Sequence, residues 1–179
     1  MAKGEKVFWY SGGMENKVNN SKNVKVEIEI GGVENLDDAL RVARLVYNPN
    51  EEEIKKYHNK ENWRSKIEKD GILVVGKVDG EIVGFLLAYK TTDEVMHVWN
   101  AGVLSEFRRL GIFSNMFEEL AVKCRQDGIK KITLHTIEKS FPEMYKFVIN
   151  KGFVEYEKEW IEDDKVGKVE KSKFELELK

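Results

Sequence analysis

Residues 95–127 read VMHVWNAGVLSEFRRLGIFSNMFEELAVKCRQD, and they divide into a strand, a short polar turn and an amphipathic helix. The first five residues are apolar or aromatic, which is typical of a buried strand. Asn100, Ala101 and Gly102 then interrupt this run. Because a glycine inside a strand often marks a bulge or a close approach by another group, we expect one of these here.

The helix begins after Gly111. Its apolar residues recur at helical spacing and form one stripe, which consists of Ile112, Phe113, Met116, Phe117, Leu120, Ala121 and Cys124. Asp127 and Gly128 end it, since glycine readily takes the left-handed conformation after the last turn. Cys124 is therefore expected to be structural, because a reactive thiol needs exposure and a lowered pKa.

A loop that carries Arg108, Arg109 and Gly111 precedes this helix. The first turn of a helix has unpaired N–H donors and a partial positive charge. A glycine there lets a phosphate approach the backbone, and two arginines add positive charge. The loop is thus predicted to be a pyrophosphate cradle, although it lacks the glycine spacing of a Walker loop or a dinucleotide fingerprint.

The segment from Val103 to Phe117 resembles the acyl-CoA-binding motif of the GNAT superfamily of N-acetyltransferases. In that motif, Arg or Gln is followed by two residues, Gly, one residue, and then Gly or Ala. Arg108 and Gly111 match it, and Val103 stands five positions before the arginine, as in the family. Phe113 departs from the pattern, because it stands where the second small residue is expected. The resemblance covers about residues 24–179.

The order of predicted elements extends the resemblance. They are a strand (24–30), two helices (36–47 and 51–60), three antiparallel strands (72–78, 81–90 and 95–99), the helix 112–126, a strand (131–136), a helix (142–150) and two strands (153–160 and 172–178) joined by a polar link. This order predicts an α/β fold with a mixed, mostly antiparallel sheet flanked by helices. It is similar to the GNAT order, and the resemblance implies splayed central strands.

The sequence also predicts two parts, an N-terminal extension (1–23) and a GNAT-like domain (24–179). Val7–Tyr10 is a short strand-like run, and 11–23 is rich in Gly, Asn, Ser and Lys, which indicates a partly flexible linker. The alternative is an aromatic plug that packs on the domain or on a partner.

Composition narrows the classes of function. The 179 residues carry 35% charged residues but a net charge of only −2, which favours neither nucleic acid nor an anionic membrane as a partner. The longest apolar run is too short to span a bilayer, and no signal peptide is visible. With a single cysteine, we expect no disulfide and a cytoplasmic location. No cluster has metal-ligand spacing, so no metal is expected.

The resemblance implies where acetyl-CoA would bind. The pantetheine arm would pair with the backbone near Ala101, Gly102 and Val103, and the N–H of Val103 would face the developing oxyanion. The pyrophosphate would lie on the amides of Arg108, Arg109, Leu110, Gly111, Ile112, Phe113 and Ser114. The amine acceptor would enter from the opposite side, under the segment between the first two helices. The candidate substrate contacts are Tyr47, Tyr57, Trp63 and Trp99.

His97 is the candidate general base. Family members place catalytic residues on the fourth strand at odd offsets before the motif arginine, and side chains alternate faces along a strand. Counting back from Arg108, that face holds Val95, His97 and Trp99. An imidazole is a suitable base near pH 7, directly or through water. The alternative is a core histidine with a satisfied hydrogen bond.

Tyr145 is the candidate acid for the leaving thiolate. Many relatives have a tyrosine four residues before the glycine of the last helix, and here that position is Val148. Tyr145 lies about one turn earlier, roughly on the same face, so it could protonate the thiolate or contact CoA. The alternative is simple packing. His58 and His135 are expected to be surface or strand-end residues.

These observations predict an acetyl-CoA-dependent N-acetyltransferase that transfers acetyl directly to an amine in a ternary complex. The acceptor would be a small molecule or a peptide, and the final hairpin could pair with a second subunit in a homodimer. One alternative is a CoA-binding regulatory or interaction domain without turnover. Another is a structural module in which Phe113 fills the cradle.

Overall fold

In the computed structural model, residues 25–163 and 167–179 are described, and their strands form one sheet in the order β1-β2-β3-β4-β5-β7-β6. All neighbours are antiparallel except β4 and β5, which are parallel. The predicted mixed, mostly antiparallel α/β fold is confirmed. The run at 7–10 and the link at 11–23 lie outside the described residues. The strands are β1 (Val26–Gly31), β2 (Gly71–Val78), β3 (Glu81–Thr92), β4 (Val95–Val103), β5 (Lys131–Thr136), β6 (Val154–Asp163) and β7 (Gly167–Glu177).

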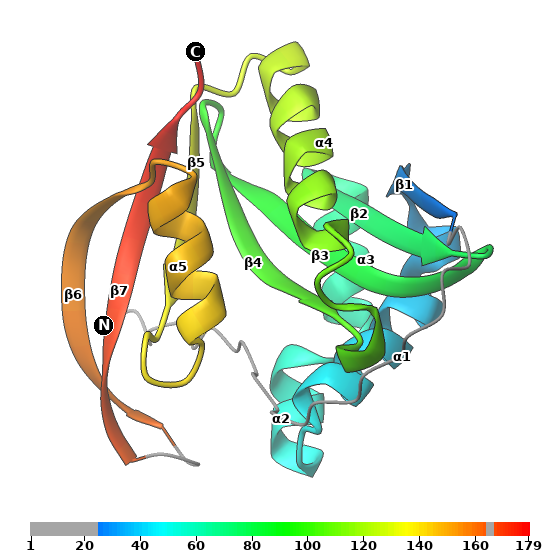
Figure 1. Cartoon of the computed structure of the whole chain (residues 1–179), viewed down its shortest axis with the longest axis horizontal. Helices are drawn as coiled ribbons and strands as arrows, with labels where there is room; N and C mark the ends of the chain where they lie inside the picture. The colour runs from blue at the N-terminus through cyan, green and yellow to red at the C-terminus, as the bar shows by residue number, and fades with distance from the viewer. Residues whose placement is uncertain (1–24, 164–166) are drawn as a thin grey trace.

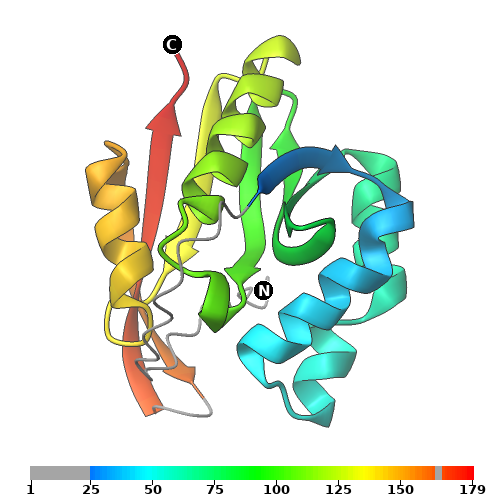
Figure 2. The same cartoon turned by 45° about the vertical axis from the view of Figure 1, so that its right-hand side comes forward.

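Helices cover both faces of the sheet (Figures 1 and 2). On one face lie α4 (Ile112–Gln126) and α5 (Pro142–Asn150), and on the other lie α1 (Leu36–Tyr47), α2 (Glu51–Tyr57) and α3 (Lys60–Lys69). Each face has its own buried apolar cluster, one under α4 and α5 and one under α1 and α3. The amphipathic stripe of α4 therefore packs as its spacing predicts.

Two segments differ most clearly from the sequence prediction. The charged helix expected at 51–60 ends at Tyr57, and α3 starts afresh because the Asn59 side chain accepts from the N–H of Asn62 at 3.1 Å. The polar link expected at 162–171 is instead mostly strand. Lys158 pairs with Glu170 across β6 and β7 at 2.9 Å, and such cross-strand pairs of opposite charge favour a sheet despite the polar sequence.

The central strands β4 and β5 separate part-way along their length. They pair only over Val95–Val98 and Lys131–Leu134, and beyond this point the two ribbons diverge (Figure 1). On its other side, β4 stays paired with β3 as far as Val103. The splay implied by the family resemblance is thus present in the sheet.

A bulge lies at the start of this splay. Leu87 of β3 pairs with Asn100, whereas the next residue of β3 pairs with Val98, so Trp99 is the extra residue of β4. The sequence placed the irregularity at Asn100–Gly102. It lies one residue earlier, and the strand continues through Gly102.

Gly76 allows the start of α4 to approach β2. A Cβ at Gly76 would lie 2.5 Å from Cγ2 of the buried Ile112, the first residue of α4. We expect Gly76→Ala to lower the free energy of unfolding by about 1–3 kcal/mol through overpacking. Each kcal/mol should lower the melting temperature by roughly 2–4 °C in a chain of this size. Thermal denaturation checks this, with the exposed Glu68→Ala as the control that should change little.

Candidate functional site

The edge of β4 that faces the gap presents the backbone of Ala101 and Val103. The N–H of Leu104 donates to the carbonyl of Val83 at 2.9 Å. In an antiparallel pair, the backbone N–H and C=O groups of successive residues point alternately toward and away from the partner strand. Since Leu104 bonds to β3, the backbone groups of Ala101 and Val103 point away from β3. Their N–H and C=O groups therefore face the space left where β5 departs.

Two side chains bind the carbonyls of this edge. The Tyr47 hydroxyl donates to the Ala101 carbonyl at 2.5 Å, and Nε of Arg108 donates to the Val103 carbonyl at 3.2 Å. Burial raises the pKa of Tyr47 well above its usual range, so the hydroxyl stays protonated and keeps donating. Tyr47, expected as a substrate contact, therefore braces β4 from α1. Contact with a substrate stays a prediction for this residue.

The loop after β4 turns sharply into α4. Arg109 and Gly111 both have left-handed backbones, with φ of 66° and 74°. The carbonyl of Gly111 accepts the first helical bond, from the N–H of Asn115 at 2.9 Å. A Cβ at Gly111 would meet nothing closer than Asn115 Nδ2 at 3.9 Å, so there is room above the backbone at this helix start. Arg108, Arg109 and the positive end of α4 thus lie together beside the gap.

Phe113 lies in the first turn of α4, with Leu110, Ile112 and Ser114 as its neighbours in the loop and helix. Its ring packs edge-on against Phe147 of α5, with centroids 4.8 Å apart. The side chain at the departure from the family motif therefore joins α4 to α5. The backbone N–H groups of this turn remain those of a helix N-terminus.

His97 lies on β4 in the last rows before the splay and is 4% exposed. Its Nδ1 is 3.0 Å from the Thr133 hydroxyl oxygen of β5. Its ring contacts Tyr89 edge-on at 5.7 Å, and Trp99 contacts the same tyrosine at 6.4 Å. The predicted shared face of His97 and Trp99 is confirmed by this common neighbour. The role of His97 as a base stays a prediction.

The prediction of a surface or strand-end position is wrong for His58 and holds for His135, the next-to-last residue of β5. His58 is 1% exposed and packs against the ring of Tyr47 at 5.4 Å, so the expectation of a surface residue is wrong. It is buried because the turn between α2 and α3 folds under α1. His135 is half-buried on β5, with its ring 4.7 Å from that of His97. Burial, followed by the nearby His97, lowers the pKa of His135 to about 3.

Aromatic side chains pack against Trp99 on the proposed acceptor side, where its ring contacts those of Trp63 and Tyr89. Trp63 is fully buried and donates its indole N–H to the Tyr57 carbonyl at 2.7 Å. Lys66 Nζ lies 3.9 Å from the Tyr89 ring centre and 4.6 Å from that of Trp99, within the range of cation–π attraction. Tyr57 and Trp63 are therefore buried side chains beneath this aromatic cluster, and their contact with a substrate stays a prediction.

Tyr145 points toward the last hairpin. Its hydroxyl donates to Glu155 at 3.5 Å, and its ring packs on Phe174 of β7 at 5.5 Å. Burial and the Glu155 carboxylate raise the pKa of Tyr145. The buried Val148 occupies the position where many family members carry their tyrosine. As the acid for a leaving thiolate, Tyr145 stays a prediction.

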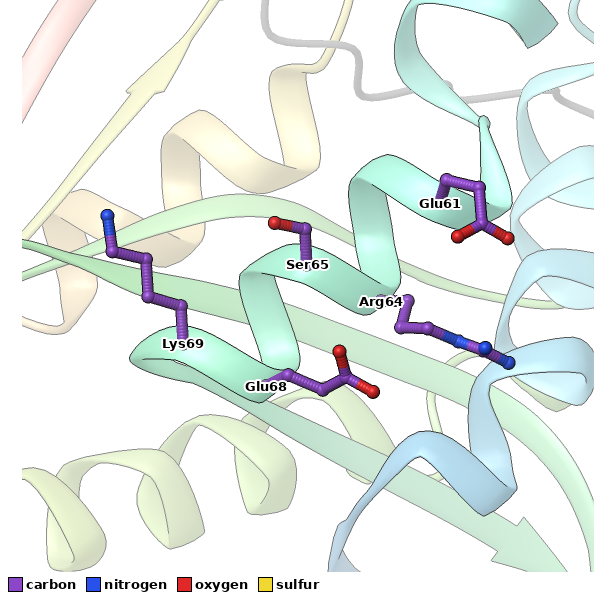
Figure 3. Close-up of a pocket in the computed structure, with 5 residues that line it drawn as sticks. All are labelled: Glu61, Arg64, Ser65, Glu68 and Lys69. Atoms are coloured by element: carbon purple, nitrogen blue, oxygen red, sulfur yellow. The ribbon is translucent and has the colours of Figure 1, made fainter.

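A separate hollow lies on α3, and none of its lining residues belongs to the gap between β4 and β5. Figure 3 shows that its lining residues all belong to that one helix and spread in several directions. They are Glu61, Arg64, Ser65, Glu68 and Lys69. Because binding sites gather polar groups that converge on one point, we place the site at the gap between β4 and β5.

Comparison with known proteins identifies the family of this chain. Residues 37–147 match the model of the acetyltransferase (GNAT) family. The chain belongs to the GNAT acetyltransferase family. A search of curated proteins gives no significant match.

Solved GNAT structures share the fold at low sequence identity. The ribosomal-protein-S18-alanine N-acetyltransferase of Escherichia coli is 13% identical with a TM-score of 0.73, covering 86% of this chain and 94% of that one. The PaiA N-acetyltransferase of Thermoplasma acidophilum, in complex with coenzyme A, is 17% identical with a TM-score of 0.66, covering 82% and 98%. Ard1 of Thermoplasma volcanium is 16% identical with a TM-score of 0.68, covering 86% and 98%.

Among residues 25–163 and 167–179, no helix is long and apolar enough to cross a membrane. Within the same ranges, no group of three or more His, Cys, Asp or Glu side chains could hold a metal ion.

Proposed function

We propose that this GNAT protein is an acetyl-CoA-dependent N-acetyltransferase that transfers acetyl directly to an amine in a ternary complex. The observation that supports this most is the open edge of Ala101 and Val103, which lies beside the Arg108–Gly111 loop at the start of α4. A similar structure, the T. acidophilum PaiA enzyme, was solved with coenzyme A.

The residues at the gap fit acetyl-CoA. The pantetheine amides would pair with the backbone of Ala101 and with the Val103 carbonyl, as a further strand does at a sheet edge, which leaves the Val103 N–H for the thioester. The pyrophosphate would take the positive start of α4, where Gly111 leaves room and Arg108 and Arg109 add charge. The N–H of Val103 would donate to the oxyanion that develops on the thioester carbonyl.

His97 would serve the acceptor amine. The imidazole, with its Nδ1 against Thr133, would take the proton of the amine, directly or through water. The neutral nitrogen attacks the carbonyl carbon, a C–N bond forms, and the C–S bond breaks to release the thiolate. The thiolate then needs a proton. Tyr145 is our candidate donor, and its donation requires the hydroxyl to leave Glu155.

Thermal unfolding with acetyl-CoA tests the first step of this proposal. A ligand at one hundred times its Kd stabilises the native state by about 2.7 kcal/mol, and we expect a rise in melting temperature of several degrees. Coenzyme A alone should give a similar rise. No shift at millimolar ligand would favour the structural module, in which no nucleotide binds.

A second candidate function is a CoA-binding regulatory domain without turnover. It is favoured by Phe113 at the position of the second small residue and by Val148 at the position of the usual tyrosine. A screen of small amines and peptide N-termini distinguishes the two functions, because only the enzyme releases free CoA thiol. Thermal stabilisation without thiol release for any amine would support the regulatory domain.

A further inference from the structure

The sheet brings two imidazoles together at the point where β4 and β5 part. His97 pairs with Thr133 in the parallel register, and the last paired row is Val98 with Leu134. His135 is the next residue of β5, and it lies on the same face as Thr133 because side chains alternate. The two rings are 4.7 Å apart and tilted by 57°. His135 thus stands at the mouth of the gap, beside the candidate base.

Positive groups surround His135 on the side of β7. Lys171 is only 2% exposed and forms an ion pair with Glu159 of β6. Lys173 contacts Glu157 at 2.8 Å and Glu159 at 3.5 Å. Glu157 and Glu159 of β6 are therefore engaged by lysines of β7.

These neighbours decide the charge of His135. Burial, His97, Lys171 and Lys173 all lower its pKa, and Glu159 opposes them more weakly. On the opposite side of the pair, α3 places the ammonium of Lys66 against Tyr89 and Trp99. His135 is therefore uncharged across the neutral range, and a second positive charge so close to an imidazolium is unfavourable. The pair therefore carries at most one positive charge.

We propose that His135 is a positioning residue for acetyl transfer, an uncharged imidazole whose contact with His97 governs how readily His97 takes the acceptor's proton. The inference rests on the proposed function, in which His97 is the base. A charged His135 would repel the imidazolium that forms on His97 during turnover. A neutral His135 lets that charge form, and its polar ring lies within van der Waals reach to stabilise it.

The experiment is an NMR pH titration of the histidine rings in the full chain. The chain has three histidines, so single changes of His58, His97 and His135 to Gln assign them all. We expect no titration of His135 between pH 5 and 8. A negative charge in His135→Glu should raise the midpoint of His97 by about one unit or more, and His135→Lys should lower it similarly. His135→Gln should lie between them.

Matched controls carry the same charges at a distance. Gln126→Glu and Gln126→Lys change an exposed residue at the far end of α4, and they should leave the His97 midpoint unchanged. If His135 itself titrates near neutral pH in the unaltered chain, or if His97 has the same midpoint in the Glu and Lys variants, the proposal is overturned.

Kinetics then separates this inference from the proposed function. The midpoint pH of the acidic limb of kcat/KM should follow the same order, highest in His135→Glu and lowest in His135→Lys. A purely structural role of His135 would lower activity without ordering these midpoints by charge. If no amine is acetylated by the unaltered protein, the proposed function fails, and the NMR order still decides whether His135 governs His97. If acetylation occurs but the midpoint of the acidic limb is the same whatever the charge at position 135, the function stands and the inference fails.

Discussion

His97→Ala is expected to lower kcat by roughly 10²–10⁴-fold at pH 7, the usual range for loss of a general base. At this pH most alkyl amines are protonated, so attack on the thioester requires removal of a proton. At higher pH the free amine becomes abundant without help, and the difference between variant and unaltered protein should shrink. Release of CoA thiol, measured from pH 6 to 10, gives the ratio directly.

His58→Gln is the matched control for this change. His58 is a buried histidine that packs against Tyr47 and Trp63, so its loss should lower stability while leaving the shape of the pH profile intact. A loss in His97→Ala that is equally large at every pH would identify His97 as a core histidine held by Thr133, the alternative that its hydrogen bond also allows.

Arg108→Ala is expected to weaken acetyl-CoA binding by about 10–100-fold. A hydrogen bond to a charged group contributes about 1.5–3 kcal/mol, and each 1.4 kcal/mol changes Kd tenfold. Arg108 lies beside the gap and holds the Val103 carbonyl through Nε. The change therefore removes positive charge and also loosens the loop that carries it. Isothermal titration calorimetry with acetyl-CoA gives both Kd values.

Arg125→Ala removes the same charge at the other end of α4, where Arg125 donates to the carbonyl of Lys179 at 3.0 Å. Its Kd should stay close to that of the unaltered protein. Raising the salt concentration should weaken acetyl-CoA binding more in the unaltered protein than in Arg108→Ala. The reason is that salt screens the attraction between Arg108 and a charged phosphate, which the variant has already lost. Equal, measurable Kd values in all three proteins would mean that Arg108 does not contact the ligand, whereas no binding in any of them would point to the structural module.

The stretch that carries the cradle was predictable because its signals are local. A run of strand-forming residues, a glycine and a change to helical spacing all lie within 33 consecutive residues. The position of the bulge was not predictable, because it depends on which residue of β3 faces Asn100. The predicted strands of the β6–β7 hairpin were too short, because charged residues do not indicate a strand in the sequence. In the structure, ion pairs between the two strands stabilise this segment.

Long-range register explains most of what the sequence did not reveal about the site. His135 joins His97 only through the parallel pairing of β4 and β5, which brings together residues almost 40 positions apart. Alternation along the short strand at 131–136 was the available signal, because it puts His135 on the same face as Thr133. Likewise, nothing local indicated that Tyr47 would reach Ala101 or that Tyr145 would turn toward Glu155.

The burial of Cys124 makes the chemistry of this protein convenient to follow. It is the single cysteine of the sequence and is 0% exposed under the stripe of α4. Burial and the nearby Asp127 raise the pKa of its thiol to about 12, so almost none is present as the reactive thiolate at neutral pH. A disulfide dye that counts released CoA would therefore meet little background from the protein. A cysteine introduced elsewhere could likewise carry a fluorescent label without removal of the native one.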